Sequence, residues 1–236
     1  MNIINALQLI VDELKLRNYS KNTQKSYCHC LRTYFNYDKQ GTQRCDVYQI
    51  KQFISSLQGN SYSSNSVSLF LNVIKFYYLA VLKTTTKINI KTPKRPKKLP
   101  ITLNNAEIQR IINSITNHKH NILISLAYGA GLRVSEIINI RVSDISLDDL
   151  VLNVKGGNGN KDRISVVPCK IVSDLQRLMD EKQQYEYVFA SERGGKLTSR
   201  TAQVIFERAL KKAGIKKQAS FYNELGFLIQ NKSPDR

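Results

Sequence analysis

The chain of 236 residues is long enough for one large domain or two modest ones, and its hydrophobic fraction of 42% fits a folded protein. Thirty-six Lys and Arg residues against 18 Asp and Glu residues give a net charge of +18, which favours nucleic acid as the partner. No apolar stretch reaches the roughly 18–20 residues of a membrane span, and the amphipathic start lacks the basic region of a secretory signal, so we expect a cytoplasmic protein.

The four cysteines do not have the spacing of a zinc site. Cys28 and Cys30 flank His29, but neighbouring side chains on a helix diverge by about 100°. We therefore expect reduced thiols and no bound metal.

Residues 1–82 are predicted to form a four-helix unit. Apolar side chains recur at helical spacing within 3–17, 27–35, 47–57 and 67–81, and Ser20 is a candidate cap for the second helix. The tyrosines at these apolar positions are interpreted as core residues.

A basic segment follows at 83–103. Pro93, Pro96 and Pro100 favour an extended chain, and residues 83–106 contain no acidic residue. Residues 1–106 carry 16 basic and 4 acidic side chains, or +12, whereas residues 107–236 carry 20 and 14, or +6. This distribution predicts a linker that contacts phosphates. Its predicted DNA-binding residues are Lys83, Lys87, Lys91, Lys94, Arg95, Lys97 and Lys98.

Residues 104–236 are predicted to be mixed α/β. Asn104 and Glu107 have the spacing of a capping box, and a buried helix is expected over 121–129. Strands over 144–147, 150–154 and 164–167 would form a three-stranded antiparallel meander, followed by helices near 170–183 and 199–213. The predicted fold class is therefore mainly α with a small antiparallel sheet.

Arg133 is the first candidate site residue. It follows Gly129 and Gly131 at a junction between two predicted helices, where a guanidinium can offer its planar fork to phosphate oxygens. Taken alone, such an arginine is more often part of an ordinary surface salt bridge.

Four motifs in order resemble the tyrosine recombinase (phage integrase) family over about 220 of the 236 residues. They are Arg17-Asn-Tyr-Ser-Lys-Asn-Thr-Gln-Lys-Ser-Tyr27, Lys94-Arg-Pro-Lys-Lys-Leu-Pro100, Gly129-Ala-Gly-Leu-Arg-Val-Ser-Glu136 and Gly156-Gly-Asn-Gly-Asn-Lys-Asp-Arg163. They look like the opening of the core-binding domain, the interdomain linker, the first catalytic box and the β-hairpin of that family.

The resemblance implies a core-binding domain at 1–82, a linker at 83–103 and a catalytic-type domain of the DNA breaking-rejoining fold at 104–236. In the family these parts clamp double-stranded DNA, and a tyrosine cuts and rejoins strands by transesterification without a metal or cofactor. By the match, Arg133 is one of the arginines that stabilise the phosphorane, and Glu136 helps to hold it. Lys21, Lys25, Lys155 and Arg163 are implied DNA contacts, and assembly with further copies or with a related recombinase is expected on DNA.

Two departures bear on catalysis. Asn158 occupies the position of the family's general-acid lysine, and an amide has no proton to give; Lys161 is a weak substitute nearby. No histidine follows His120, no His-x-x-Arg box follows Gly214, and Tyr222 lies upstream of the nucleophile's usual place. We therefore expect a catalytic-type domain that is incomplete at its C-terminus and inactive alone.

Three functions stay open on the sequence. The chain could be a recombinase that borrows residues from a partner chain, a non-catalytic binder or regulator that occupies recombination sites, or a degenerate gene product with residual DNA affinity. An RNA-binding module is disfavoured because the predicted meander offers no aromatic stacking platform.

Overall fold

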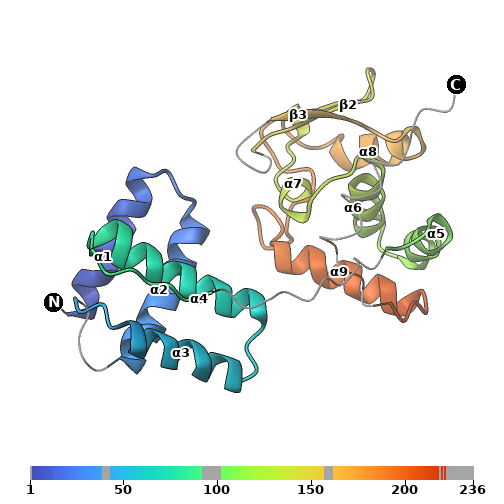
Figure 1. Cartoon of the computed structure of the whole chain (residues 1–236). Helices are drawn as coiled ribbons and strands as arrows, with labels where there is room; N and C mark the ends of the chain where they lie inside the picture. The colour runs from blue at the N-terminus through green and yellow to red at the C-terminus, as the bar shows by residue number, and fades with distance from the viewer. Residues whose placement is uncertain are drawn as a thin grey trace, which may run out of the picture. The chain divides into compact units, whose positions relative to one another are not determined.

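A computed structural model describes residues 2–38, 43–91, 102–156, 162–217, 219 and 221. The chain forms two compact units, Met1–Lys98 and Leu99–Arg236 (Figure 1). Within the described ranges, no helix is long and apolar enough to cross a membrane.

The described residues of the first unit form four α-helices, as the recurring apolar residues predict. They are α1 (Ile3–Leu16), α2 (Lys21–Tyr37), α3 (Val47–Gly59) and α4 (Ser64–Phe76). Each begins at a side-chain cap: Asn2, Ser20, Asp46 and Ser63 accept hydrogen bonds from backbone N–H groups of the first turn. The predicted cap at Ser20 is thus confirmed.

The core of this unit is rich in aromatic side chains. Tyr34, Tyr77 and Tyr78 are fully buried, as predicted. The Tyr34 hydroxyl donates a hydrogen bond of 3.1 Å to the buried carboxylate of Asp38. Burial moves the pKa of Tyr34 far above its ordinary value, so the hydroxyl stays a donor.

The fourth helix differs from the single α-helix expected over 67–81. The α-helix ends at Phe76 and continues as a π-helical turn, η1 (Tyr77–Val81), in which the Leu82 N–H bonds to the Tyr77 carbonyl. A π-turn is wider than an α-turn, so each residue rotates the chain less. This places the consecutive Tyr77 and Tyr78 side chains together in the core.

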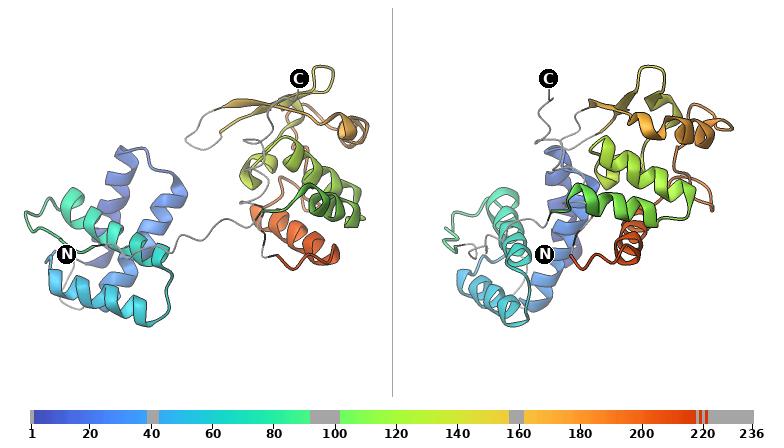
Figure 2. Two further views of the ribbon diagram at one scale, coloured as in Figure 1. Left: turned by 45° about the vertical axis from the view of Figure 1, so that its right-hand side comes forward. Right: turned by 90° about the vertical axis from the view of Figure 1, so that its right-hand side faces the viewer.

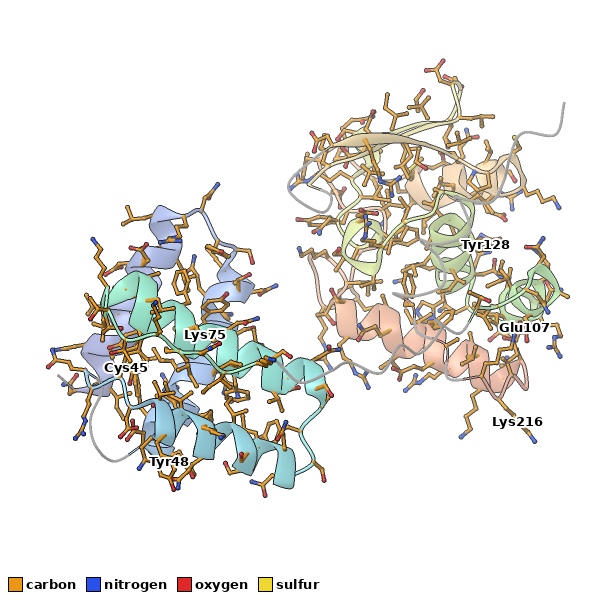
Figure 3. The ribbon with its side chains drawn as sticks, in the orientation of Figure 1. Cys45, Tyr48, Lys75, Glu107, Tyr128 and Lys216 are labelled. Carbon is orange, nitrogen blue, oxygen red and sulfur yellow. The ribbon has the colours of Figure 1, made fainter. Side chains whose placement is uncertain are left out.

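The segment after η1 runs along the helical unit. Ile88 is buried in the helical core. The ammonium of Lys75, a residue of α4 labelled in Figure 3, donates a hydrogen bond of 2.8 Å to the Ile90 carbonyl. The first part of the predicted linker therefore packs against α-helical residues. Residues 92–101 of that prediction lie outside the described residues.

The second unit combines helices with a small sheet. Its elements are α5 (Asn105–Ser114), α6 (His118–Gly129), α7 (Val134–Ile137), η2 (Val142–Asp144), β1 (Ile145–Ser146), β2 (Val151–Val154), β3 (Arg163–Val166), η3 (Cys169–Ile171), α8 (Val172–Met179) and α9 (Ser199–Lys212). The strands are antiparallel in the order β1-β2-β3, with Ile145 opposite Leu152 and Val154 opposite Arg163. This confirms the predicted fold class, and Asn104 and Glu107 form the predicted capping box.

Helix α6 is at the centre of this unit, with contacts to α5, α7 and α8 (Figure 2). Five of its side chains are buried around the helix: Ile122, Leu123, Ile124, Leu126 and Ala127. A helix that is apolar on all sides belongs in an interior. The helix expected over 170–183 is shorter, since α8 ends at Met179 and the Glu186 carboxylate accepts the Gln183 N–H in the turn that follows.

Candidate nucleic-acid interface

The turn between α6 and α7 brings Arg133 to its position. A side chain at Gly129 would place its Cβ 2.1 Å from Cγ of Pro168, and Gly131 has a φ of +60°. The first position therefore needs glycine for close packing, and the second needs it for its left-handed backbone. After this turn, Arg133 becomes the N-cap residue of α7.

Glu136 binds both the backbone and the side chain of Arg133. The Arg133 N–H donates to Oε2 of Glu136 at 2.8 Å, and Nη1 of Arg133 donates to Oε1 at 3.0 Å. The Glu136 side chain is 2% exposed, whereas that of Arg133 is 48% exposed. A buried carboxylate thus holds the guanidinium of a half-exposed arginine side chain.

Arg163 on β3 reaches the same carboxylate from a distant part of the chain. Its Nη2 donates to Oε2 of Glu136 at 2.9 Å and to the Gly131 carbonyl at 3.0 Å. Two residues further along β3, the Ser165 hydroxyl donates to the Ala130 carbonyl at 2.7 Å. These bonds join β3 to the glycine turn and place two arginines on one carboxylate.

Glu136 is ionised in this setting. Burial alone would raise its pKa, but hydrogen bonds from the backbone and side chain of Arg133 and from Arg163 outweigh burial and lower the pKa below its ordinary value. The cluster of two guanidiniums and one carboxylate keeps a net charge of +1. Guanidinium N–H groups that make no bond to Glu136 or Gly131 are donors of the kind that bind anions.

A second buried acid lies beside this cluster. Asp144 accepts the Arg141 N–H at 2.9 Å, and its Oδ1 is 2.5 Å from the Lys155 ammonium. Glu136, Asp144 and Lys155 line one polar cavity of about 230 Å³. Lys155 therefore neutralises a buried acid, and its role as a DNA contact stays a prediction.

Sequence reasoning missed Asp144 and the bond between Arg163 and Glu136. Arg141 and Asp144 have the same three-residue spacing as Arg133 and Glu136, and both pairs form backbone caps. That repeated spacing was a usable signal for Asp144. No local pattern indicates a bond between residues 136 and 163, because it depends on how β3 packs.

The other predicted site residues are distributed over both units. Lys21 and Lys25 are exposed on one face of the first turns of α2, and Lys83, Lys87 and Lys91 are exposed along the segment after η1. Lys94, Arg95, Lys97, Lys98, Asn158, Lys161 and Tyr222 lie outside the described residues. The part of the chain that the structure covers contains no group of three or more His, Cys, Asp or Glu side chains placed to hold a metal ion.

Comparison with known proteins gives matches for both units. Residues 102–223 match the phage integrase family, and residues 7–88 match the N-terminal SAM-like domain of phage integrases. Tyrosine recombinase XerA of Pyrococcus horikoshii is 30% identical over 206 residues, a match that covers 86% of this chain and 71% of XerA. A tyrosine recombinase of Thermosipho africanus is 28% identical over 217 residues, covering 86% of this chain and 76% of the relative.

Solved structures share the fold at lower identity. A lambda integrase tetramer bound to a Holliday junction matches with a TM-score of 0.74 at 16% identity, covering 94% of this chain and 70% of the lambda chain. The Tn1549 transposon integrase in complex with transposon right end DNA matches with a TM-score of 0.71 at 15% identity, covering 91% and 80%. At these identities the likeness concerns the fold.

Proposed function

Because this chain belongs to the phage integrase family of tyrosine recombinases, we propose that it binds double-stranded DNA and that Arg133 and Arg163 hold one backbone phosphate. The observation that carries the proposal is the pair of guanidiniums from separate segments, braced by the buried carboxylate of Glu136. Such bracing orients both arginines before a ligand arrives, so less side-chain entropy is lost on binding.

The arginines retain donors for a phosphate. Within the described residues, Glu136 accepts from one N–H of the Arg133 guanidinium, and Gly131 and Glu136 accept from Nη2 of Arg163. A guanidinium has five N–H donors, so Nη2 and Nε of Arg133 and Nη1 and Nε of Arg163 remain. A phosphate accepts from several such donors at once, whereas a neutral ligand would leave the net charge of the cluster unmatched.

The remaining affinity is proposed to come from the lysines of the first unit and the linker. Lys21, Lys25, Lys83, Lys87 and Lys91 are exposed, and an exposed ammonium gains most of its binding energy by releasing counterions from DNA. The lambda integrase structures that share this fold hold dimers and tetramers on DNA, and we extend multimeric binding to this chain as part of the proposal.

We further propose that the 236-residue chain occupies DNA without cutting it. Asn158 supplies no proton where the family's lysine would, and Tyr222 is upstream of the place of the family's nucleophile. The arginine cluster would then bind the phosphate without taking part in strand cleavage.

Fluorescence anisotropy with a labelled duplex of about 40 base pairs tests the proposal. If on the order of six phosphates are neutralised, the affinity should fall about 10³-fold between 50 and 200 mM salt. Arg133→Ala should weaken binding and reduce the slope of log affinity against log salt by about 0.9.

Arg177→Ala is the matched control, because it removes the same charge from an exposed position on α8. If the two variants reduced the slope equally, net charge and not the cluster would account for binding. Affinity that does not depend on salt would contradict the whole proposal.

A further inference from the structure

The second unit contains another cationic cavity, at the opposite end of α6 from Arg133. The cavity has a volume of about 140 Å³ and lies between the start of α6 and the C-terminal half of α9. Its polar lining includes Thr116, Asn117, His120, Arg208 and Lys212. Helix α6 has 12 residues, which at 1.5 Å per residue separates the two sites by about 18 Å.

The charges of this cavity are unbalanced. Arg208 and Lys212 are four residues apart on α9, a spacing at which like charges on one helix face repel each other. Among the residues that the structure describes, neither has a hydrogen-bond or ion-pair partner, and the cavity lining contains no carboxylate. An anion in the cavity would relieve this repulsion.

His120 lies in this cavity, where burial and nearby positive charge both act on its imidazole. Burial, Lys119 and Arg208 lower its pKa, and Glu192 opposes them only in part. The imidazole therefore stays neutral near neutral pH unless negative charge enters the cavity. This makes His120 a local reporter of anion binding.

We propose that the cavity formed by His120, Arg208 and Lys212 is a second phosphate-binding subsite. The guanidinium of Arg208, the ammonium of Lys212 and the imidazole of His120 all line this cavity, and each offers N–H donors that an anion such as phosphate can accept from. A space of about 140 Å³ is enough for one tetrahedral anion. Because of the separation along α6, the phosphate bound here differs from the one proposed at Arg133.

Titration of the three histidines by NMR tests this subsite on the full chain. Sulfate is the first probe, since it is tetrahedral and keeps both charges from pH 5 to 8, and chloride at equal ionic strength is the reference. We expect sulfate to raise the pKa of His120 saturably while His29 and His118 follow the chloride reference. A rise of one unit would mean about tenfold tighter sulfate binding to the protonated ring than to the neutral ring.

Variants assign the effect to the cavity. Arg208→Gln/Lys212→Gln should abolish the selective rise, whereas Lys211→Gln/Lys216→Gln removes equal charge from exposed residues outside the lining and should preserve it. The rise should also survive Arg133→Ala, which separates this subsite from the proposed site at the arginine pair. A rise shared by all three histidines, no rise at all, or a rise that persists in Arg208→Gln/Lys212→Gln would each overturn the proposal.

Two further arms identify the source of the phosphate. If a duplex of about 20 base pairs raises the pKa of His120 as sulfate does, the subsite takes a backbone phosphate of DNA. If sulfate and inorganic phosphate act but the duplex does not, the subsite takes a free phosphate. Both results support the phosphate chemistry.

Discussion

Replacing Glu136 by glutamine removes the charge that braces the two arginines while keeping the shape of the side chain. In the wild type, the carboxylate accepts from the Arg133 N–H and Nη1 and from Nη2 of Arg163, at 2.8, 3.0 and 2.9 Å. A glutamine oxygen can still accept the backbone N–H, but its amide group presents donors toward a guanidinium, which is also a donor.

The cost of this change follows from the hydrogen bonds and the exposure of their donors. A hydrogen bond to a charged group contributes about 1.5–3 kcal/mol, and two such bonds are weakened or lost. The side chains of Arg133 and Arg163 are 48% and 35% exposed, so water recovers part of that energy. We expect a loss of about 2 kcal/mol in the free energy of unfolding, or a fall of roughly 6 °C in the melting temperature of the second unit.

Differential scanning calorimetry measures this effect, with Glu181→Gln as the control because Glu181 is an exposed acid of the same unit. The effect also depends on pH. Since the folded-state pKa of Glu136 is depressed, its ionised form stabilises the fold above the unfolded value near 4.5, and this contribution is lost as the pH falls through the lower folded pKa. The difference between wild type and Glu136→Gln should therefore be full at pH 7 and shrink below pH 4.5. Equal stability of Glu136→Gln and Glu181→Gln at pH 7 would refute the bracing role.

Three other outcomes are expected. Gly129→Ala should destabilise the second unit by about 1–3 kcal/mol in chemical denaturation, because the new Cβ would overlap Pro168; an unchanged midpoint would show that Pro168 moves aside at little cost. Lys75→Met should speed tryptic cleavage after Lys87 relative to a Lys51→Met control, because it releases the Ile90 carbonyl and loosens the packed segment; equal rates would mean that Ile88 holds this segment without Lys75. A denaturing gel with a nicked suicide duplex should show no covalent adduct between DNA and the 236-residue chain, and Asn158→Lys should not create one. A retarded protein–DNA band that disappears in Tyr222→Phe would instead identify Tyr222 as a nucleophile.

Local patterns were sufficient for most elements of the fold. Helical spacing of apolar residues predicts α1 to α4, and short-range signals such as Ser20 and the pair of Asn104 and Glu107 mark where helices begin. The alternation of residues 144–167 with two turns predicts the meander. These helices, helix starts and strands are set by residues that lie close together in the chain, so the local sequence is enough to predict them. The same holds for Arg133, because the glycines that position it are adjacent in the chain.

The departures from prediction come from packing. The π-turn at Tyr77 places two consecutive tyrosines in the core. Periodicity analysis assumes a constant rotation per residue, so it predicts an uninterrupted α-helix there. The segment around Ile88 has the composition of a linker, but it packs against the helices through the buried Ile88, the partly buried Ile90 and the Lys75 hydrogen bond. Neither result follows from the local sequence alone.

The candidate sites divide in the same way. The sequence by itself determined the high positive charge, the position of Arg133 at a junction between two helices, and the position of Glu136 three residues later in the first turn of the second helix. Only the tertiary structure brought Arg163 to Glu136, paired Lys155 with Asp144, and set His120 of α6 beside Arg208 and Lys212 of α9. The physical reason is that these side chains meet because strands and helices pack. Their spacing along the chain is set by the lengths of the intervening elements and bears no relation to the chemistry of the contact.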